Sequence, residues 1–238
     1  MNPYEKLIAR KRKWTPVQME AGPLKEGAEE VIQRALAMRH MELPVGDFIS
    51  HSLKGEVPEA AREILQMNII DEENHDRALN YAVRAHPVDQ KLEAEAKLIT
   101  KAWEDHPDHT IGKAMVAERS IFFCLLPLFR FCGDSGLRTV SADISRDEQI
   151  HVATNSLVCR ELGLNVSPSL NKLRKATIEW VFQPLAEENA DKFLAKKFWR
   201  KQSDDLFEKG KADGFSATRS ARMPAFFEHS NLNLPQYA

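Results

Sequence analysis

The feature that most constrains this chain is a motif that occurs twice, Asp-Glu-x-x-His. The first copy is Asp71–His75 and the second is Asp147–His151, and both lie within long segments whose apolar spacing predicts helices. Because three residues advance a helix by about 300°, the glutamate and the histidine of each copy lie on one helix face, one turn apart. A carboxylate and an imidazole at that spacing can reach the same metal ions. A single Glu-x-x-His would be weak support, since glutamate is common on solvated helix faces.

A second spacing makes the pattern more specific. Glu42 lies 30 residues before Glu72, and Glu118 lies 30 residues before Glu148, so the chain contains Glu-x29-Glu-x2-His twice. Two antiparallel helices joined by a turn place residues at the same height when each is equally far from the turn. Each arm of such a hairpin has about 13 residues, or roughly 20 Å. Two hairpins packed face to face would bring four glutamates and two histidines together at the middle of a bundle.

Six buried polar groups would destabilise an apolar core unless cations compensated them. A site rich in carboxylates with one imidazole per metal suits iron or manganese better than zinc. We therefore predict two metal ions. The predicted ligands are Glu42, Glu72, His75, Glu118, Glu148 and His151. Glu29 and Glu30 are alternatives to Glu42, but they lie 43 and 42 residues before Glu72, which would require a long loop.

The residues around these ligands predict a supporting shell. Asp71 and Asp147 precede the two motif glutamates, and each could accept the free ring N–H of a ligand histidine. Four apolar residues lie one or two helical turns from the predicted ligands: Leu79, Phe122, Leu126 and Ile144. They would form a pocket wall that keeps water from a reactive oxygen intermediate. They are equally explained as ordinary core, because core and pocket wall are one surface here.

The rest of the chain predicts an all-α protein, since it has only 10 glycines and no pattern of short alternating strands. The expected helices span residues 24–53, 58–86, 88–105, 110–131, 137–162, 170–192 and 195–211. Pro44 should kink or break the first of these, and Pro184 should interrupt the segment 170–192. We expect an irregular N-terminal arm over residues 1–22, one helical domain over 23–213 and an extended tail over 214–238.

Composition argues against several functional classes. A net charge of −2 gives no strong field for nucleic acid or for a membrane surface. The longest apolar stretch is broken by Pro127 and Arg130 and falls short of the ~20 residues that span a bilayer. No secretory signal is recognisable, so we expect a cytoplasmic protein. The cysteines Cys124, Cys132 and Cys159 include no CxxC pair, which argues against a zinc–thiolate site and a disulfide framework.

The motifs resemble those of the ferritin-like dimetal-carboxylate superfamily, and within it the ribonucleotide reductase small subunit. Ile144–His151 looks like that family's Ile-x-Arg-Asp-Glu-x-x-His, and the run Pro58–His75 and the Phe122 that follows Glu118 are also similar. The resemblance covers residues 37–162 and implies a ferritin-like four-helix bundle with additional helices. It implies Glu42, Glu72 and His75 on one metal and Glu118, Glu148 and His151 on the other, with some glutamates bridging. It also implies O2 activation, a homodimer and a large-subunit partner.

One departure from the family changes the expected chemistry. The family's radical tyrosine normally lies four residues after the first histidine, where this chain has Leu79. Tyr81 falls on another helix face, so a tyrosyl radical at the usual place is excluded. Some family members instead store the oxidising equivalent on a manganese/iron pair and, like this chain, have glutamate at the position of Glu42. The expected cofactor is thus Fe/Fe or Mn/Fe.

Three functions stay open at this point. The leading one is a ribonucleotide reductase small subunit without a tyrosyl radical. The second is a related dimetal oxidase or monooxygenase that acts on a small apolar substrate. The third is a metal-storage or structural bundle without turnover.

The two chain ends carry further candidates. Trp14 lies in a Trp-Thr-Pro sequence that resembles the family's N-terminal one, and Tyr237 lies in a tail that could dock the large subunit. Both are candidates for radical or electron transfer. A packing anchor and a frayed end explain them equally well. The basic cluster Arg10–Lys13 is interpreted as part of a solvated arm.

Overall fold

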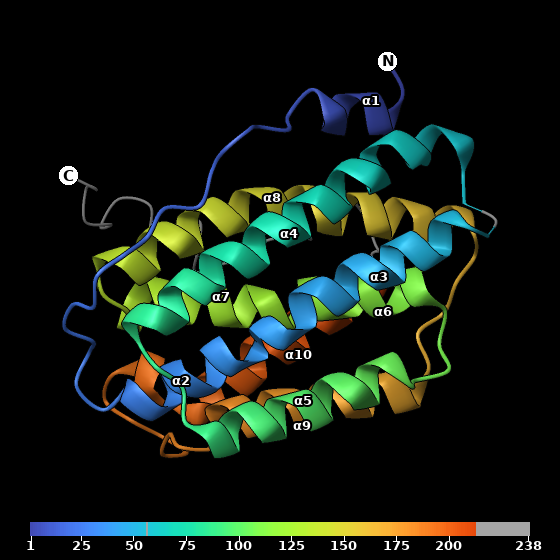
Figure 1. Cartoon of the computed structure of the whole chain (residues 1–238). Coiled ribbons are helices and arrows are strands. Elements are labelled where there is room, and N and C mark those ends of the chain that lie inside the picture. The colour runs from blue at the N-terminus through green and yellow to red at the C-terminus, as the bar shows by residue number, and fades with distance from the viewer. Residues whose placement is uncertain (56, 213–238) are drawn as a thin grey trace.

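The computed structural model describes residues 1–55 and 57–212, and within them two antiparallel helix hairpins form the centre of the molecule (Figure 1). The first hairpin pairs α3 (Glu42–Leu53) with α4 (Arg62–Ala85). The second pairs α8 (Ser135–Glu161) with a long rod formed by α6 (Thr110–Ala117), a π-helical segment (Glu118–Phe122) and α7 (Phe123–Cys132). α3 packs on α6 and α4 packs on α8, so the hairpins lie face to face as the spacing predicts.

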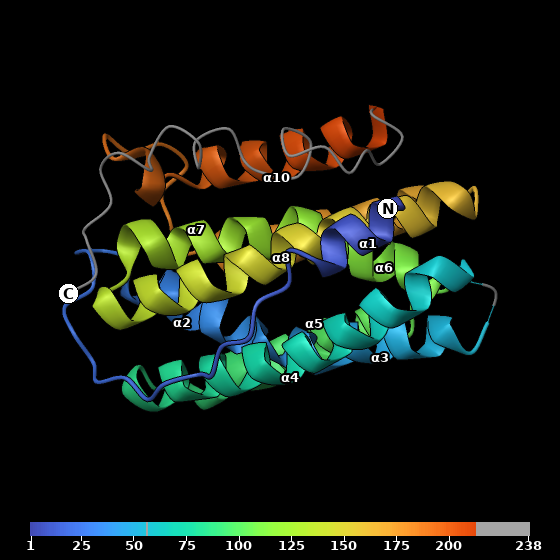
Figure 2. The same ribbon diagram turned by 90° about the horizontal axis from the view of Figure 1, so that it is seen from above.

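Four further helices cover the side of the bundle away from the α4–α8 seam. They are α2 (Glu29–Ala37), α5 (Gln90–Glu104), α9 (Pro168–Phe182) and α10 (Lys196–Ala212). α2 packs against α5 and α9, while α10 packs against α7, α9 and the π-helical segment (Figure 2). No helix among the described residues has the length and apolarity that crossing a membrane requires.

The N-terminal arm is not wholly irregular, so that prediction was wrong over its first residues. α1 (Pro3–Ile8) forms because Asn2 and Glu5 make a capping box, in which each side chain binds the other residue's backbone N–H. Tyr4 is buried and its hydroxyl donates to Glu161 at 2.9 Å. α1 packs against both α4 and α8, and the chain then runs from α8 toward α4 (Figure 2).

The first predicted helix is broken at a different place from the one expected. A 3-10 turn over Met38–Met41 separates α2 from α3, and Glu42 is the first residue of α3. Pro44 lies within the first turn of α3, where the missing backbone N–H costs no intrahelical hydrogen bond. The predicted interruption of the segment 170–192 at Pro184 is confirmed, because α9 ends at Phe182, two residues before this proline. The predicted tail, 214–238, lies outside the described residues.

Asp134 fastens the arm to the bundle. One carboxylate oxygen caps α8 by accepting the backbone N–H of Leu137 at 2.8 Å. The other accepts the backbone N–H of Gly22 at 2.7 Å and contacts His86 Nε2 at 2.8 Å. Asp134 itself is buried, so these contacts are shielded from water.

Replacing Asp134 with alanine should destabilise the fold by about 2–3 kcal/mol, since it removes a helix cap and leaves two donors without their acceptor. Urea unfolding measures the change. Asp89→Ala is a suitable control, because Asp89 caps α5 from an exposed position through one side-chain bond, to Lys91 N. A loss no larger than the control's would show that the arm attachment contributes nothing.

Candidate metal centre

The structure brings all six predicted ligands together at the centre of the two hairpins. Each lies on one of the four central helical rods, and each is at most 1% exposed. Glu42 opens α3, Glu118 opens the π-helical segment, and the two Glu-x-x-His pairs lie on α4 and α8. The equal spacing of the two hairpins therefore gives the convergence that the sequence predicts. Metal ligation by these residues stays a prediction.

On one side of the cluster, three carboxylates surround His75. The distances from His75 Nδ1 are 3.6 Å to Glu42 Oε2, 3.3 Å to Glu72 Oε2 and 3.3 Å to Glu148 Oε1. Glu42 therefore belongs to the His75 side of the cluster.

On the other side, three carboxylates surround His151. The distances from His151 Nδ1 are 2.9 Å to Glu72 Oε1, 3.8 Å to Glu118 Oε1 and 3.8 Å to Glu148 Oε1. Glu72 and Glu148 thus face both rings, and one ligand atom from each of Glu72, His75, Glu148 and His151 lies within 4.8 Å of the others. Glu72 and Glu148 therefore lie between the two histidines, with Glu42 and Glu118 at the two ends.

The outer nitrogens of the two histidines are held by the motif aspartates, in a crossed pattern. His75 Nε2 lies 3.3 Å from Asp147 Oδ2, and His151 Nε2 lies 3.0 Å from Asp71 Oδ2. Each aspartate therefore binds the histidine of the opposite motif, across the α4–α8 seam. Because Nε2 faces a carboxylate, Nδ1 of each ring is the atom that points at the glutamates.

The N-terminal arm covers these aspartates. Trp14 Nε1 donates to Asp147 Oδ2 at 2.6 Å, and the indole stacks on the His75 ring with centroids 6.2 Å apart. Lys11 forms an ion pair with Asp71, and its side chain is only 5% exposed. The interpretation of the basic cluster as solvated is wrong for Lys11. The sequence does contain a signal for this ion pair, namely the aspartate of each motif. A buried aspartate needs a cation or a hydrogen-bond donor beside it.

The polar atoms at the centre fit bound cations. Seven carboxylate oxygens of the four glutamates and Nδ1 of both histidines are buried and make no hydrogen bond, and the remaining oxygen, on Glu118, accepts Asn155 Nδ2 at 2.7 Å. Orphaned buried acceptors at this density are rare unless an ion satisfies them. A set of oxygens with one imidazole per position is the donor chemistry that iron and manganese prefer.

Without cations, the cluster must hold protons instead. Burial raises the pKa of Glu42 and of Glu118 well above the ordinary value. Burial opposes charge on His151 as well, but the neighbouring Glu72 and Asp71 raise its pKa to about 10. Glu72 is the exception, because its two histidine neighbours outweigh burial and lower its pKa. Any metal ion bound here would therefore compete with protons for the same atoms.

The metal-free protein should lose stability as the pH rises from about 6.5 to 9. Glu42, Glu118 and His151 have a higher pKa in the folded protein than in the unfolded chain, so the folded protein binds more protons. The stability that these bound protons contribute is lost as the pH rises through the folded pKa values. The lowered pKa of Glu72 adds no slope in this range, since its contribution is complete above about pH 5. We expect the Tm of the metal-free protein to fall by about 5 °C or more in calorimetry.

Metal-loaded protein is the control for that experiment, because cations bind more tightly as protons leave and its Tm should not fall. A metal-free Tm that rises over the same range would contradict the proton-sharing account.

Glu118 begins an irregular turn of the bundle. The sequence predicts a continuous helix over 110–131, but the turn from Glu118 to Phe122 is π-helical. The π turn disturbs the backbone bonding, and the carbonyl of Ser120 accepts Ser203 Oγ from α10 at 2.6 Å. Insertions of this kind are frequent at functional sites. Here the insertion sets the position of one central carboxylate.

The predicted pocket residues are buried: Leu79, Phe122, Leu126 and Ile144. Their role as the wall of a substrate or oxygen pocket stays a prediction.

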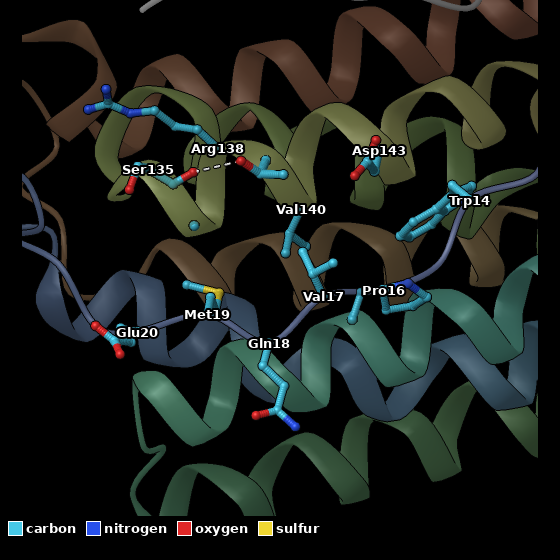
Figure 3. Close-up of a pocket in the computed structure, with 13 residues that line it drawn as sticks. Trp14, Pro16, Val17, Gln18, Met19, Glu20, Ser135, Arg138, Val140 and Asp143 are labelled. Carbon is cyan, nitrogen blue, oxygen red and sulfur yellow. Dashed lines mark hydrogen bonds between the residues drawn. The ribbon is translucent and has the colours of Figure 1, made fainter. Parts of the chain in front are cut away.

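A cavity of about 630 Å³ lies elsewhere, between the arm and α8 (Figure 3). Trp14, Val17 and Met19 line it from the arm, and Val140 and Asp143 line it from α8. Trp14 therefore both lines this cavity and stacks on His75.

No protein-family model matches the chain, and no curated protein matches its sequence. A solved structure does match: a protein from Bacillus halodurans that is provisionally described as a class I ribonucleotide reductase. The match covers 94% of this chain and 93% of that chain, with a TM-score of 0.61 and 14% sequence identity. At this identity the match shows a shared fold. The predicted all-α, ferritin-like bundle is thereby confirmed.

Proposed function

We propose that this chain is an O2-activating dimetal-carboxylate protein, and that it acts as the small subunit of a ribonucleotide reductase without a tyrosyl radical. The observation that carries the proposal is the buried Glu4His2 cluster together with a hydrogen-bonded link from it to the arm. That link runs from His75 through Asp147 to Trp14. The fold shared with the Bacillus halodurans protein is consistent with it.

Each residue has a role in this proposal. The proposed ligands are Glu42, Glu72, His75, Glu118, Glu148 and His151. Bound iron and manganese, or two irons, would supply an oxidant from O2. Asp71 and Asp147 hold the outer ring nitrogens and so fix the ligand orientation of each histidine. The apolar residues around the cluster exclude water from the oxidant.

Leu79 decides where the oxidising equivalent is kept. It occupies the position at which the resembling family carries its radical tyrosine, and it is buried. A leucine cannot hold an oxidising equivalent, so bound metal ions would have to supply that function as well, as a Mn/Fe pair or two irons would. Trp14 is the proposed exit, because its indole touches both Asp147 and the His75 ring. Tyr237, the second candidate, lies outside the described residues.

A dimetal oxidase or monooxygenase is the second candidate function. The specific observation in its favour is also Leu79, since a buried leucine in place of tyrosine leaves an apolar surface rather than a redox-active one. Such an enzyme would oxidise a small apolar substrate directly at the metals. It would need no large subunit.

The test combines this protein, loaded with Mn²⁺ and Fe²⁺ in the presence of O2, with the large subunit from the same organism. Nucleoside diphosphate reduction that requires both proteins supports the proposal. Oxidation of an added apolar compound without nucleotide reduction would replace it with the oxidase. Loosely held metal without O2 uptake would leave a storage or structural bundle. Anomalous scattering at the iron and manganese edges identifies the metals, and sedimentation tests the expected homodimer.

A further inference from the structure

The arm binds the two motif aspartates with donors of different charge. Asp147 Oδ2 accepts the neutral indole N–H of Trp14 and also lies against His75 Nε2. Asp71 Oδ2 accepts the ammonium of Lys11 and also lies against His151 Nε2. In both cases one carboxylate oxygen is shared between the arm and a histidine. The two halves of the centre are thus alike in geometry and unlike in charge.

Arg12 does not remove this difference. Its Nε is 3.9 Å from Asp147 Oδ1, and its Nη1 is 3.1 Å from Asp143, with which it forms the closer ion pair. The Arg12 side chain is 28% exposed, whereas the Lys11 side chain is 5% exposed. A buried charge in hydrogen-bonding contact acts more strongly than a partly solvated one at a longer distance.

A carboxylate that accepts the outer N–H of a ligand histidine makes the ring a better donor to its metal. A cation on the same carboxylate oxygen competes for that electron density and reduces the effect. The same cation also repels a divalent ion bound at the far side of the ring, with little water between them. The weaker donation by the ring and the repulsion of the bound ion both act at His151. Both are smaller at His75.

We propose that Lys11 makes the two metal positions unequal, so that a divalent cation binds more weakly beside His151 than beside His75. The His75 position then fills first, and an ordered loading of two different metals becomes feasible. The proposal rests on the metal centre of the proposed function. It assigns Lys11 as a positioning residue that acts on the cation through Asp71 and His151.

Lys11 has the opposite effect on the metal-free protein. There the ammonium and His151 both pair with Asp71, and a buried carboxylate that loses one of its two ion-pair partners is destabilised. Removing the charge should therefore lower the stability of the metal-free fold and, at the same time, strengthen metal binding. A purely structural lysine would lower both, so the two signs separate the roles.

The experiment compares Lys11→Met with the wild type in anaerobic Mn²⁺ titrations, with the free ion read from its electron paramagnetic resonance signal. The wild type should show two unequal binding steps. In Lys11→Met the weaker step should tighten by about tenfold, while the metal-free Tm falls. Lys13→Met is the matched control, because Lys13 is an exposed lysine on the same arm, and it should leave both steps unchanged. Lys11→Arg should restore two unequal steps.

Crystals grown at one Mn²⁺ per chain locate the first ion by anomalous scattering, and we expect it beside His75. An unchanged weaker step in Lys11→Met, weaker binding at both positions, or a first ion beside His151 would overturn the proposal. A wild type that binds no Mn²⁺ would instead refute the proposed metal centre itself. Because the titration uses no O2 and no large subunit, its result does not depend on turnover.

Discussion

The Glu148→Ala protein is expected to lose its ability to hold two metal ions. Glu148 Oε1 lies 3.3 Å from His75 Nδ1 and 3.8 Å from His151 Nδ1, so this carboxylate faces both proposed positions. Its removal takes a ligand from each and one negative charge from the pair. Changes in residues that merely support ligands cost 10–100-fold in metal affinity, so loss of a bridging ligand should cost more than about 100-fold at one position at least. Metal analysis after gel filtration should fall from two ions per chain to one or fewer.

The metal-free form of Glu148→Ala should not be destabilised to the same degree. Burying four carboxylates together is unfavourable, and removing one relieves repulsion while leaving a small cavity. Calorimetry of the metal-free protein therefore separates loss of binding from loss of fold. Glu73→Ala is the control, because Glu73 is an exposed glutamate next to Glu72 and should keep both ions. Two fully occupied sites in Glu148→Ala would refute the ligand set.

The convergence of the six predicted ligand residues could be foreseen because it depends on chain geometry alone. Glu42 and Glu118 each lie 30 residues before a motif glutamate, and an antiparallel hairpin converts that equality into equal height. The helical segments were predictable for a different reason, because apolar spacing indicates which face of a helix is buried.

Other features depend on contacts between segments that no spacing links. Lys11 and Asp71 are 60 residues apart, and their pairing follows from where the arm crosses the α4–α8 seam. The crossed pairing of Asp147 with His75 likewise depends on how the hairpins face each other. At the π turn that begins with Glu118, the carbonyl of Ser120 accepts a hydrogen bond from Ser203 of α10, a contact that the local sequence does not reveal.

Trp14 of the arm should have a large effect on nucleotide reduction, because its indole contacts both Asp147 and a proposed ligand ring. The indole N–H donates to Asp147 at 2.6 Å, and Asp147 in turn holds His75 Nε2 at 3.3 Å. If an oxidising equivalent leaves the metals by this link, two properties of the indole are required: its N–H donor and its low oxidation potential. Packing alone would require only a flat aromatic ring on His75.

Trp14→Phe tests this distinction, since phenylalanine keeps a ring against His75 but has no N–H and is much harder to oxidise. We expect nucleotide reduction with the large subunit to fall by at least about 100-fold, which corresponds to roughly 2.7 kcal/mol of barrier. Two metal ions per chain and O2 uptake during loading should be retained, and both are measured on the same samples. Trp180→Phe is the control, because Trp180 lies on α9 and binds Glu95, away from the arm. Full nucleotide reduction by Trp14→Phe would exclude the arm as the route of the oxidising equivalent. Oxidation of an apolar substrate that does not depend on Trp14 would favour the oxidase.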